Sequence, residues 1–255
     1  APATQRFGAL LLYHGFILLP VLGVGPYLLP RMFNLPNRHL IAPKSPHPSR
    51  TWCDRAAISL AGGVVVLAGL AIEARGQPSL GLGLRAAGAF FCLWHALPLH
   101  RVRAVRGSIP WALLIAIVSI LAGLAVIAIW PHRMMTWLHL VFISGYGLLV
   151  LNIAARVMLG HSGQGELIYA RSRASRWITG LALLAMATRV SADLLPRMQL
   201  SHYAYAAITW VVVTAIWLAV YGPLVREAPS DPIAREVLRG KPYKYLRSRG
   251  SMPQR

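Results

Sequence analysis

The chain has 255 residues, of which 56% are hydrophobic, and its 26 Lys and Arg residues against seven Asp and Glu residues give a net charge of +19. On a soluble protein such a charge would suggest a nucleic-acid partner. Here the basic residues lie between long apolar runs, as in the loops of membrane proteins, so we expect the lipid bilayer and no nucleic acid as the partner.

Seven apolar runs approach the roughly 20 residues that a bilayer-crossing helix needs. In chain order they are about Phe7–Leu29, Ala56–Ile72, Ser79–Leu99, Ile109–Trp130, Met134–Leu159, Trp177–Leu195 and Tyr203–Tyr221. The first contains Pro20, Gly23 and Pro26, so we expect it to kink or unwind toward its second end. The predicted fold class is all-α, a polytopic transmembrane helical bundle of about seven spans.

The loops between these runs alternate between rich and poor in basic residues. Only single arginines follow the second, fourth and sixth runs: Arg75, Arg133 and Arg197. Several basic residues follow each of the other runs, which by the positive-inside rule places the N-terminus outside and the C-terminus in the cytoplasm. We therefore expect a transmembrane domain over residues 1–225 and a basic cytoplasmic tail with a short helix over residues 226–255.

Several features are expected to be missing. Cys53 and Cys92 both fall in the cytoplasmic half, so we predict no disulfide and interpret both as small apolar fillers. No basic stretch, short apolar run and cleavage site precede the first long run, so we expect no secretory signal peptide. The chain also lacks a nucleophile–base pair, a phosphate loop and paired carboxylates, so catalysis of the hydrolase or kinase type is not expected.

Titratable side chains inside apolar runs are costly in lipid and are therefore candidate functional residues. Four of them fall in the outer third of the predicted membrane: His14, His139, Arg189 and Asp193. Two histidines at matched depth can ligate a haem iron or help to bind copper, and Arg189 can pair with a haem propionate. The alternatives are that each histidine hydrogen-bonds a neighbouring helix, and that Arg189 and Asp193 neutralise each other one helical turn apart.

A second polar group is expected at the inner surface. It comprises Arg31, His95, His100, Arg156, His161 and Glu166. His161 stands 22 residues after His139, or roughly 33 Å along a continuous helix, so the two cannot share one metal unless that helix breaks. The glycines around His161 predict a tight turn, where its ring can bond free helix-end carbonyls or, alternatively, take part in a ligand or anion site.

Two stretches, Trp137–Leu140 and Ala155–Gly163, resemble the signature of the NnrS family. The segments Gly23–Arg31 and Trp217–Glu227 are similar to weaker parts of the same family pattern. The resemblance is to the C-terminal portion of longer family members. It implies a multi-pass protein of the bacterial inner membrane that is linked to the nitric-oxide response and contains haem and copper.

By position in that pattern, His139 and His161 match the motif histidines, and Arg156 and Arg31 match the motif arginines. His14 has no counterpart, so its predicted ligand role rests on its depth alone. We therefore consider three hypotheses for the function of the chain: a haem- or copper-binding protein of the nitric-oxide response, a non-catalytic subunit of a larger membrane complex, and a small-solute transporter. The first is favoured by the motif, and a non-enzymatic role is favoured over turnover.

Overall fold

The structure is a computed structural model that describes residues 2–33, 35, 48–97 and 107–226, and all regular structure in these ranges is helical. The α-helices are α1 (Ala3–Leu10), α2 (Phe16–Met32), α3 (Arg50–Ala74), α4 (Pro78–Ala96), α5 (Ser108–Ile129), α6 (Met134–His139), α7 (Leu148–His161), α8 (Arg173–Leu194) and α9 (Gln199–Tyr221). Shorter π and 3₁₀ turns join them: η1 (Leu11–Gly15), η3 (Pro131–Arg133), η4 (Leu140–Gly147), η5 (Gly165–Tyr169), η6 (Pro196–Met198) and η7 (Gly222–Arg226). The predicted all-α class is confirmed.

Each of the seven predicted runs falls in one helical segment. Five of these segments are long and apolar enough to cross a membrane: Ala3–Met32, Arg50–Ala74, Ser108–Ile129, Pro131–His161 and Pro196–Arg226. The other two are α4 and α8, which are more polar because α4 holds Arg85 and α8 holds an arginine–aspartate pair. The structure thus shows seven helical segments, five of which qualify as membrane spans by length and composition.

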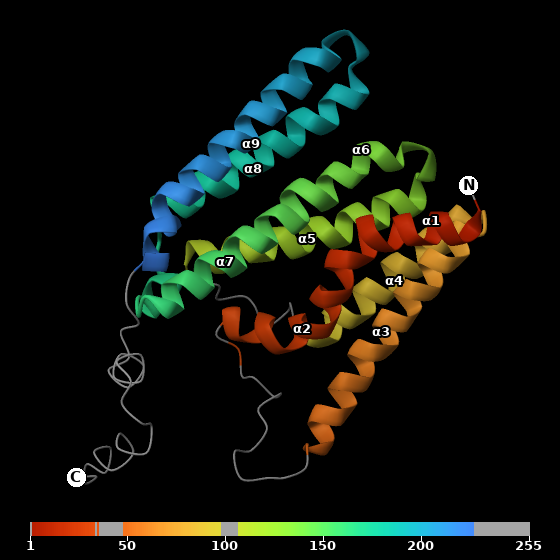
Figure 1. The fold of residues 1–255 in the computed structure, drawn as a ribbon, viewed down its shortest axis with the longest axis horizontal. Helices are drawn as coiled ribbons and strands as arrows, with labels where there is room; N and C mark the ends of the chain where they lie inside the picture. Colours follow the sequence, from red (N-terminus) through yellow and green to blue (C-terminus); the bar gives the residue numbers. More distant parts are fainter. Residues whose placement is uncertain (1, 34, 36–47, 98–106, 227–255) are drawn as a thin grey trace.

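Helix α5 lies in the middle of the bundle, between the α1–α4 group and the α8–α9 pair (Figure 1). It packs against α4, α7, η4 and α8. Its 22 residues include no charged side chain, and fully buried positions such as Leu113, Ile117 and Ile120 recur along it. A helix that is apolar on every side can face either other helices or lipid, so its composition is compatible with this central place.

Two helical hairpins, α3–α4 and α8–α9, flank this centre (Figure 1). Glycines bring α3 and α4 into close contact: a Cβ atom added to Gly81 would lie 2.5 Å from the carbonyl oxygen of Gly69. The close contact recurs seven residues before Gly69 on α3, where a Cβ atom added to Gly62 would lie 2.9 Å from the Cβ atom of Cys92. We call this line of close contacts between α3 and α4 the glycine seam. Small residues are what allow helix backbones to approach closely in membranes.

The first helical segment bends strongly between α1 and the end of α2 (Figure 1). The predicted kink is therefore present, but the chain remains helical through Met32 and does not unwind at its prolines. The irregular hydrogen bonding falls earlier, in the π turn Leu11–Gly15. The predicted tight turn after α7 is also confirmed, because α7 ends at His161 and Gly163 adopts a positive φ of 78°.

The cysteines agree with the sequence analysis only in part. Both are free thiols, as predicted. Cys92 is a buried filler, whereas Cys53 is exposed on the first turn of α3, so its interpretation as a packed apolar residue is wrong. The predicted short helix of the tail and His100 lie outside the described residues.

Candidate functional site

His14 lies on an irregular turn of the first helical segment. The π turn Leu11–Gly15 places its side chain inside the bundle, where the residue is buried. Its ring stacks on that of Phe142, with 5.8 Å between centroids and 22° between planes. Single π turns inside α-helices are often found at functional sites, because the extra residue redirects a side chain. The local structure thus gives His14 a definite orientation toward the helix that carries His139.

His139 immediately precedes a second π-helical stretch, Leu140–Gly147. Its Nδ1 atom lies 3.3 Å from the carbonyl oxygen of Thr136 in the preceding turn. A backbone carbonyl at Nδ1 favours the proton on that nitrogen, which leaves Nε2 with a lone pair. This is the usual arrangement of a metal-ligating imidazole, in which the second nitrogen is held by a backbone acceptor.

The predicted pairing of Arg189 with Asp193 is confirmed. Nη1 of Arg189 lies 2.7 Å from Oδ1 of Asp193, one helical turn away on α8. The hydroxyl of Tyr203 donates to the same oxygen at 2.8 Å, and the Arg189 guanidinium stacks 3.9 Å above the Tyr203 ring. His139 joins this group from α6, with 3.9 Å between its Nδ1 and Oδ2 of Asp193. Three members of the outer group, His139, Arg189 and Asp193, are therefore brought together around Asp193, whereas His14 makes none of these contacts.

The structure also contains a buried charge pair that the sequence analysis missed. Nη1 of Arg85 on α4 lies 3.4 Å from Oε2 of Glu73 on α3, and the Arg85 side chain is fully buried. Among the described residues, Nε, Nη1 and Nη2 of Arg85 have no hydrogen-bond partner. A buried guanidinium with unsatisfied donors is costly in a membrane protein and marks a candidate functional group.

Arg85 belongs to the same region as His14. It lies within electrostatic range of His14 and of Tyr146, which is buried on η4. The signal was available in the sequence, because Arg85 is the single charged residue between Ser79 and Leu99. The close contact of α3 and α4 at Gly69 and Gly81 directs Glu73, near the end of α3, toward Arg85.

The predicted iron ligands His14 and His139 have different nearest neighbours. His14 stacks on Phe142, while His139 faces Asp193 on α8. Over the described ranges, no three His, Cys, Asp or Glu side chains gather closely enough to hold a metal ion.

The residues predicted at the inner surface do not form one cluster. The Arg31 guanidinium stacks 4.2 Å above its neighbour Tyr27, and its carbonyl accepts a hydrogen bond of 2.9 Å from Tyr169. Arg156 is half-buried, and its Nε has no partner among the described residues. His161 is exposed at the end of α7 and makes none of the described hydrogen bonds, so the expected bond to a helix-end carbonyl is not observed.

His139 and His161 lie on one unbroken helical segment, Pro131–His161. The π stretch changes its hydrogen bonding but does not interrupt it. Their 22-residue separation therefore corresponds to roughly 33 Å, and the two motif histidines cannot share one metal ion. His95, also predicted here, is exposed and bonds the carbonyl of Phe91 in its own helix through Nδ1 at 2.9 Å.

Comparison with known proteins gives one result. The model of the family described as NnrS protein matches residues 3–228. No curated protein and no solved structure matches the chain. The matched range contains every residue of the outer and inner groups described above, from His14 to Tyr203.

Proposed function

This chain belongs to the NnrS family, and from that premise we propose that it binds haem or copper in the bacterial inner membrane as part of the response to nitric oxide. The observation that carries the proposal is the placement of His14 and His139. Both are on or beside π-helical turns, and the two turns are in contact through the stacked rings of His14 and Phe142. Buried imidazoles on irregular turns are suited to ligating a metal that sits between helices.

The protein groups around these histidines fit a haem or a copper ion chemically. The carbonyl of Thr136 orients His139 so that Nε2 is available as a ligand. The unsatisfied N–H groups of Arg85 fit a carboxylate such as a haem propionate, since guanidinium groups bind carboxylates in a bidentate manner. Arg189 remains a proposed propionate partner, although Asp193 and Tyr203 already engage it.

The bound group would supply gas binding and redox chemistry, and the protein would set its surroundings. The chain's own contribution is to hold the imidazoles, to exclude water through the packing of Phe142 and Tyr146, and to balance charge through Arg85 and Glu73. His161 would act apart from this outer site, because the helix between His139 and His161 is continuous.

The metal-binding proposal can be tested on protein purified from bacterial membranes in mild detergent. We expect a Soret band, bound copper, or both, and we expect His14→Ala and His139→Ala each to lose that signal. His95→Ala is the matched control, because His95 is exposed at the end of α4 and belongs to the group predicted at the inner surface, so its loss should leave the signal unchanged. Wild-type protein without a Soret band and without metal would contradict the proposal, as would full retention in both outer variants.

We also propose the full seven-span topology, with the N-terminus outside and the C-terminus cytoplasmic. Helices α4 and α8 each pair with a segment that qualifies as a span, α3 and α9 respectively. A hairpin partner of equal length that returns alongside a spanning helix has to cross the same thickness of lipid. Figure 1 is consistent with this arrangement: the start of α1, the α5–α6 turn and the α8–α9 turn lie toward one end, and the ends of α7 and α9 toward the other.

A further inference from the structure

A cavity of about 950 Å³ lies between the first turns of α5, the first turns of α8 and the short helix η5. The cavity lies where α5 and α8 begin. His14 and His139 do not line it. Neither the metal-binding proposal nor the family pattern makes use of its lining residues.

The floor of this cavity is built by specific backbone contacts. The backbone N–H of Ser108 donates to the carbonyl of Ala170 at 3.0 Å, and the Ser108 hydroxyl donates to the carbonyl of Ser172 at 3.1 Å. Gly107 has a φ of 101°, and a Cβ atom there would lie 2.7 Å from the backbone of Tyr169. These contacts fasten the start of α5 to the segment that presents Arg171.

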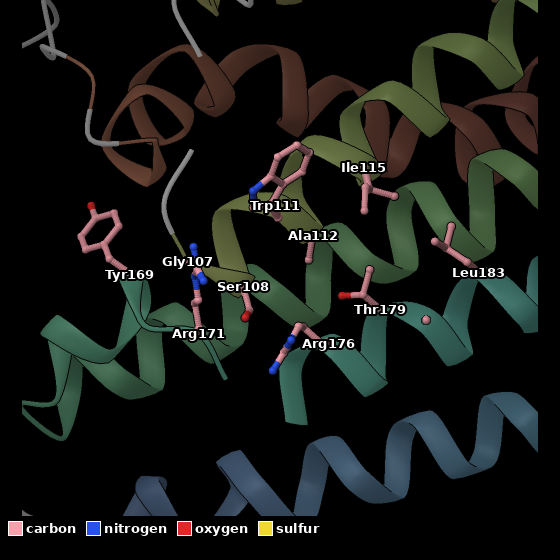
Figure 2. Close-up of a pocket in the computed structure, with 11 residues that line it drawn as sticks. Gly107, Ser108, Trp111, Ala112, Ile115, Tyr169, Arg171, Arg176, Thr179 and Leu183 are labelled. Carbon is pink, nitrogen blue, oxygen red and sulfur yellow. The ribbon is translucent and has the colours of Figure 1, made fainter. Parts of the chain in front are cut away.

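Two arginines stand at the polar end of the cavity. Arg171 and Arg176 both line it, and neither forms an ion pair with an acidic residue in the part of the chain that the structure describes. Figure 2 shows Arg171 beside Gly107 and Ser108, and Arg176 between Ser108 and Thr179. The first turns of two helices contribute further partial positive charge to this end. The arrangement is complementary to a phosphate group.

The opposite end of the cavity is apolar. Along α5 the lining residues Ser108, Trp111 and Ile115 follow helical spacing, and along α8 Arg176, Thr179 and Leu183 do the same. Each stripe thus runs from a polar residue at the helix start to an aliphatic residue seven positions later, about 10 Å deeper. Figure 2 shows Ile115 and Leu183 together at the end away from Tyr169.

We propose that this cavity binds one anionic phospholipid of the cytoplasmic leaflet, with its phosphate at Arg171 and Arg176 and an acyl chain between Ile115 and Leu183. A free phosphate ion would use only the polar end and would leave the apolar end empty. Trp111, 53% exposed, lies at the mouth, where an amphipathic aromatic ring is suited to the lipid headgroup level. Basic pockets between helices on the cytoplasmic side are a known form of headgroup site.

Native mass spectrometry of the full chain in mild detergent tests the ligand class. Titration with phosphatidylglycerol should give a saturable adduct of one lipid, whereas phosphatidylcholine and inorganic phosphate should bind much more weakly. Each of Arg171→Gln and Arg176→Gln should weaken phosphatidylglycerol binding about fivefold. The matched control is Arg173→Gln, an exposed arginine of the same segment that does not line the cavity and should leave binding unchanged.

A second pair of variants tests the apolar half without altering charge. Gly180 lines the cavity, and a Cβ atom there meets nothing within 4 Å, so Gly180→Trp should fold and fill the space. Gly83 on α4 also has open space at its Cβ position and does not line the cavity, so Gly83→Trp is the control. We expect Gly180→Trp to remove the lipid adduct and Gly83→Trp to retain it.

Three results would overturn the proposal. The first is equal binding of phosphatidylglycerol and phosphatidylcholine, which would show that the net negative charge of the lipid is not recognised. The second is binding of inorganic phosphate as tight as that of the lipid, which would assign the site to a free anion. The third is phosphatidylglycerol binding that is unchanged both in the Arg171/Arg176 double variant and in Gly180→Trp.

Discussion

The guanidinium of Arg85 and the carboxylate of Glu73 face each other inside the α3–α4 hairpin, with 3.4 Å between Nη1 and Oε2 and side-chain exposures of 0% and 7%. Arg85 also lies within electrostatic range of His14 and of Tyr146 on η4, the region of the proposed metal site. A buried ion pair of this kind contributes little net stability, but breaking it leaves an isolated charge in a low-dielectric interior.

Glu73→Gln is therefore expected to destabilise the protein by about 3–5 kcal/mol, because it leaves the Arg85 charge buried without its partner. The double variant Glu73→Gln with Arg85→Met should recover most of this loss, since both charges are then gone. The unfolding free energies of the single and the double variant are measured by circular dichroism in mixed detergent micelles. Arg75→Gln, in the exposed turn next to Glu73, is the control, and an equal loss in that variant would contradict the argument.

The glycine seam between α3 and α4 predicts a sharp difference between two neighbouring glycines. Gly81→Ala places a methyl group 2.5 Å from the carbonyl oxygen of Gly69, so the helices have to separate at a cost of roughly 1–3 kcal/mol. Gly83→Ala meets no atom within 4 Å and should leave stability unchanged or slightly raised, because alanine favours the helix. Equal unfolding free energies of the two variants would show that the seam is not tightly packed.

The network around Asp193 predicts a graded series. Asp193→Asn weakens the charged hydrogen bonds from Arg189 and Tyr203 and should cost about 2 kcal/mol. Tyr203→Phe removes the hydrogen bond to Asp193 and the exposed one from Gln199 but keeps the aromatic ring under the Arg189 guanidinium, so about 1 kcal/mol is expected. Gln199→Ala removes only an exposed bond to Tyr203 and serves as the control. The order of unfolding free energies is the measurement, and a reversed order would contradict this network.

The proposed topology predicts which side of the membrane reaches Cys53. This exposed thiol lies at the start of α3, which the proposed topology places in the cytoplasm, whereas Cys92 is buried. A membrane-impermeant maleimide should label Cys53 in inverted vesicles and not in intact spheroplasts. Arg133→Cys in a Cys53→Ser background should give the opposite pattern, because Arg133 lies in the turn between α5 and α6. Labelling of Cys53 in spheroplasts would reverse the orientation.

The candidate site was predicted from the sequence only in outline. The one-turn pairing of Arg189 and Asp193 follows from helical spacing, and the structure confirms it. Arg85 was visible as a lone charge in an apolar run, yet its partner could not be predicted, because Glu73 faces it only where Gly69 and Gly81 let two backbones meet. The stacking of His14 on Phe142 joins residues 128 positions apart and depends on two π turns that no sequence pattern marked.

The sequence by itself determined the seven helical segments and the alternation of basic loops, because hydrophobic length and flanking charge are local properties of the chain. The tertiary structure alone decided which side chains meet: how far each helix rotates about its axis, and which helix it packs against, are set by shape complementarity between distant segments. The pairing of Arg85 with Glu73 and the cavity between α5 and α8 arise at that level, since in each the partners come from different helices.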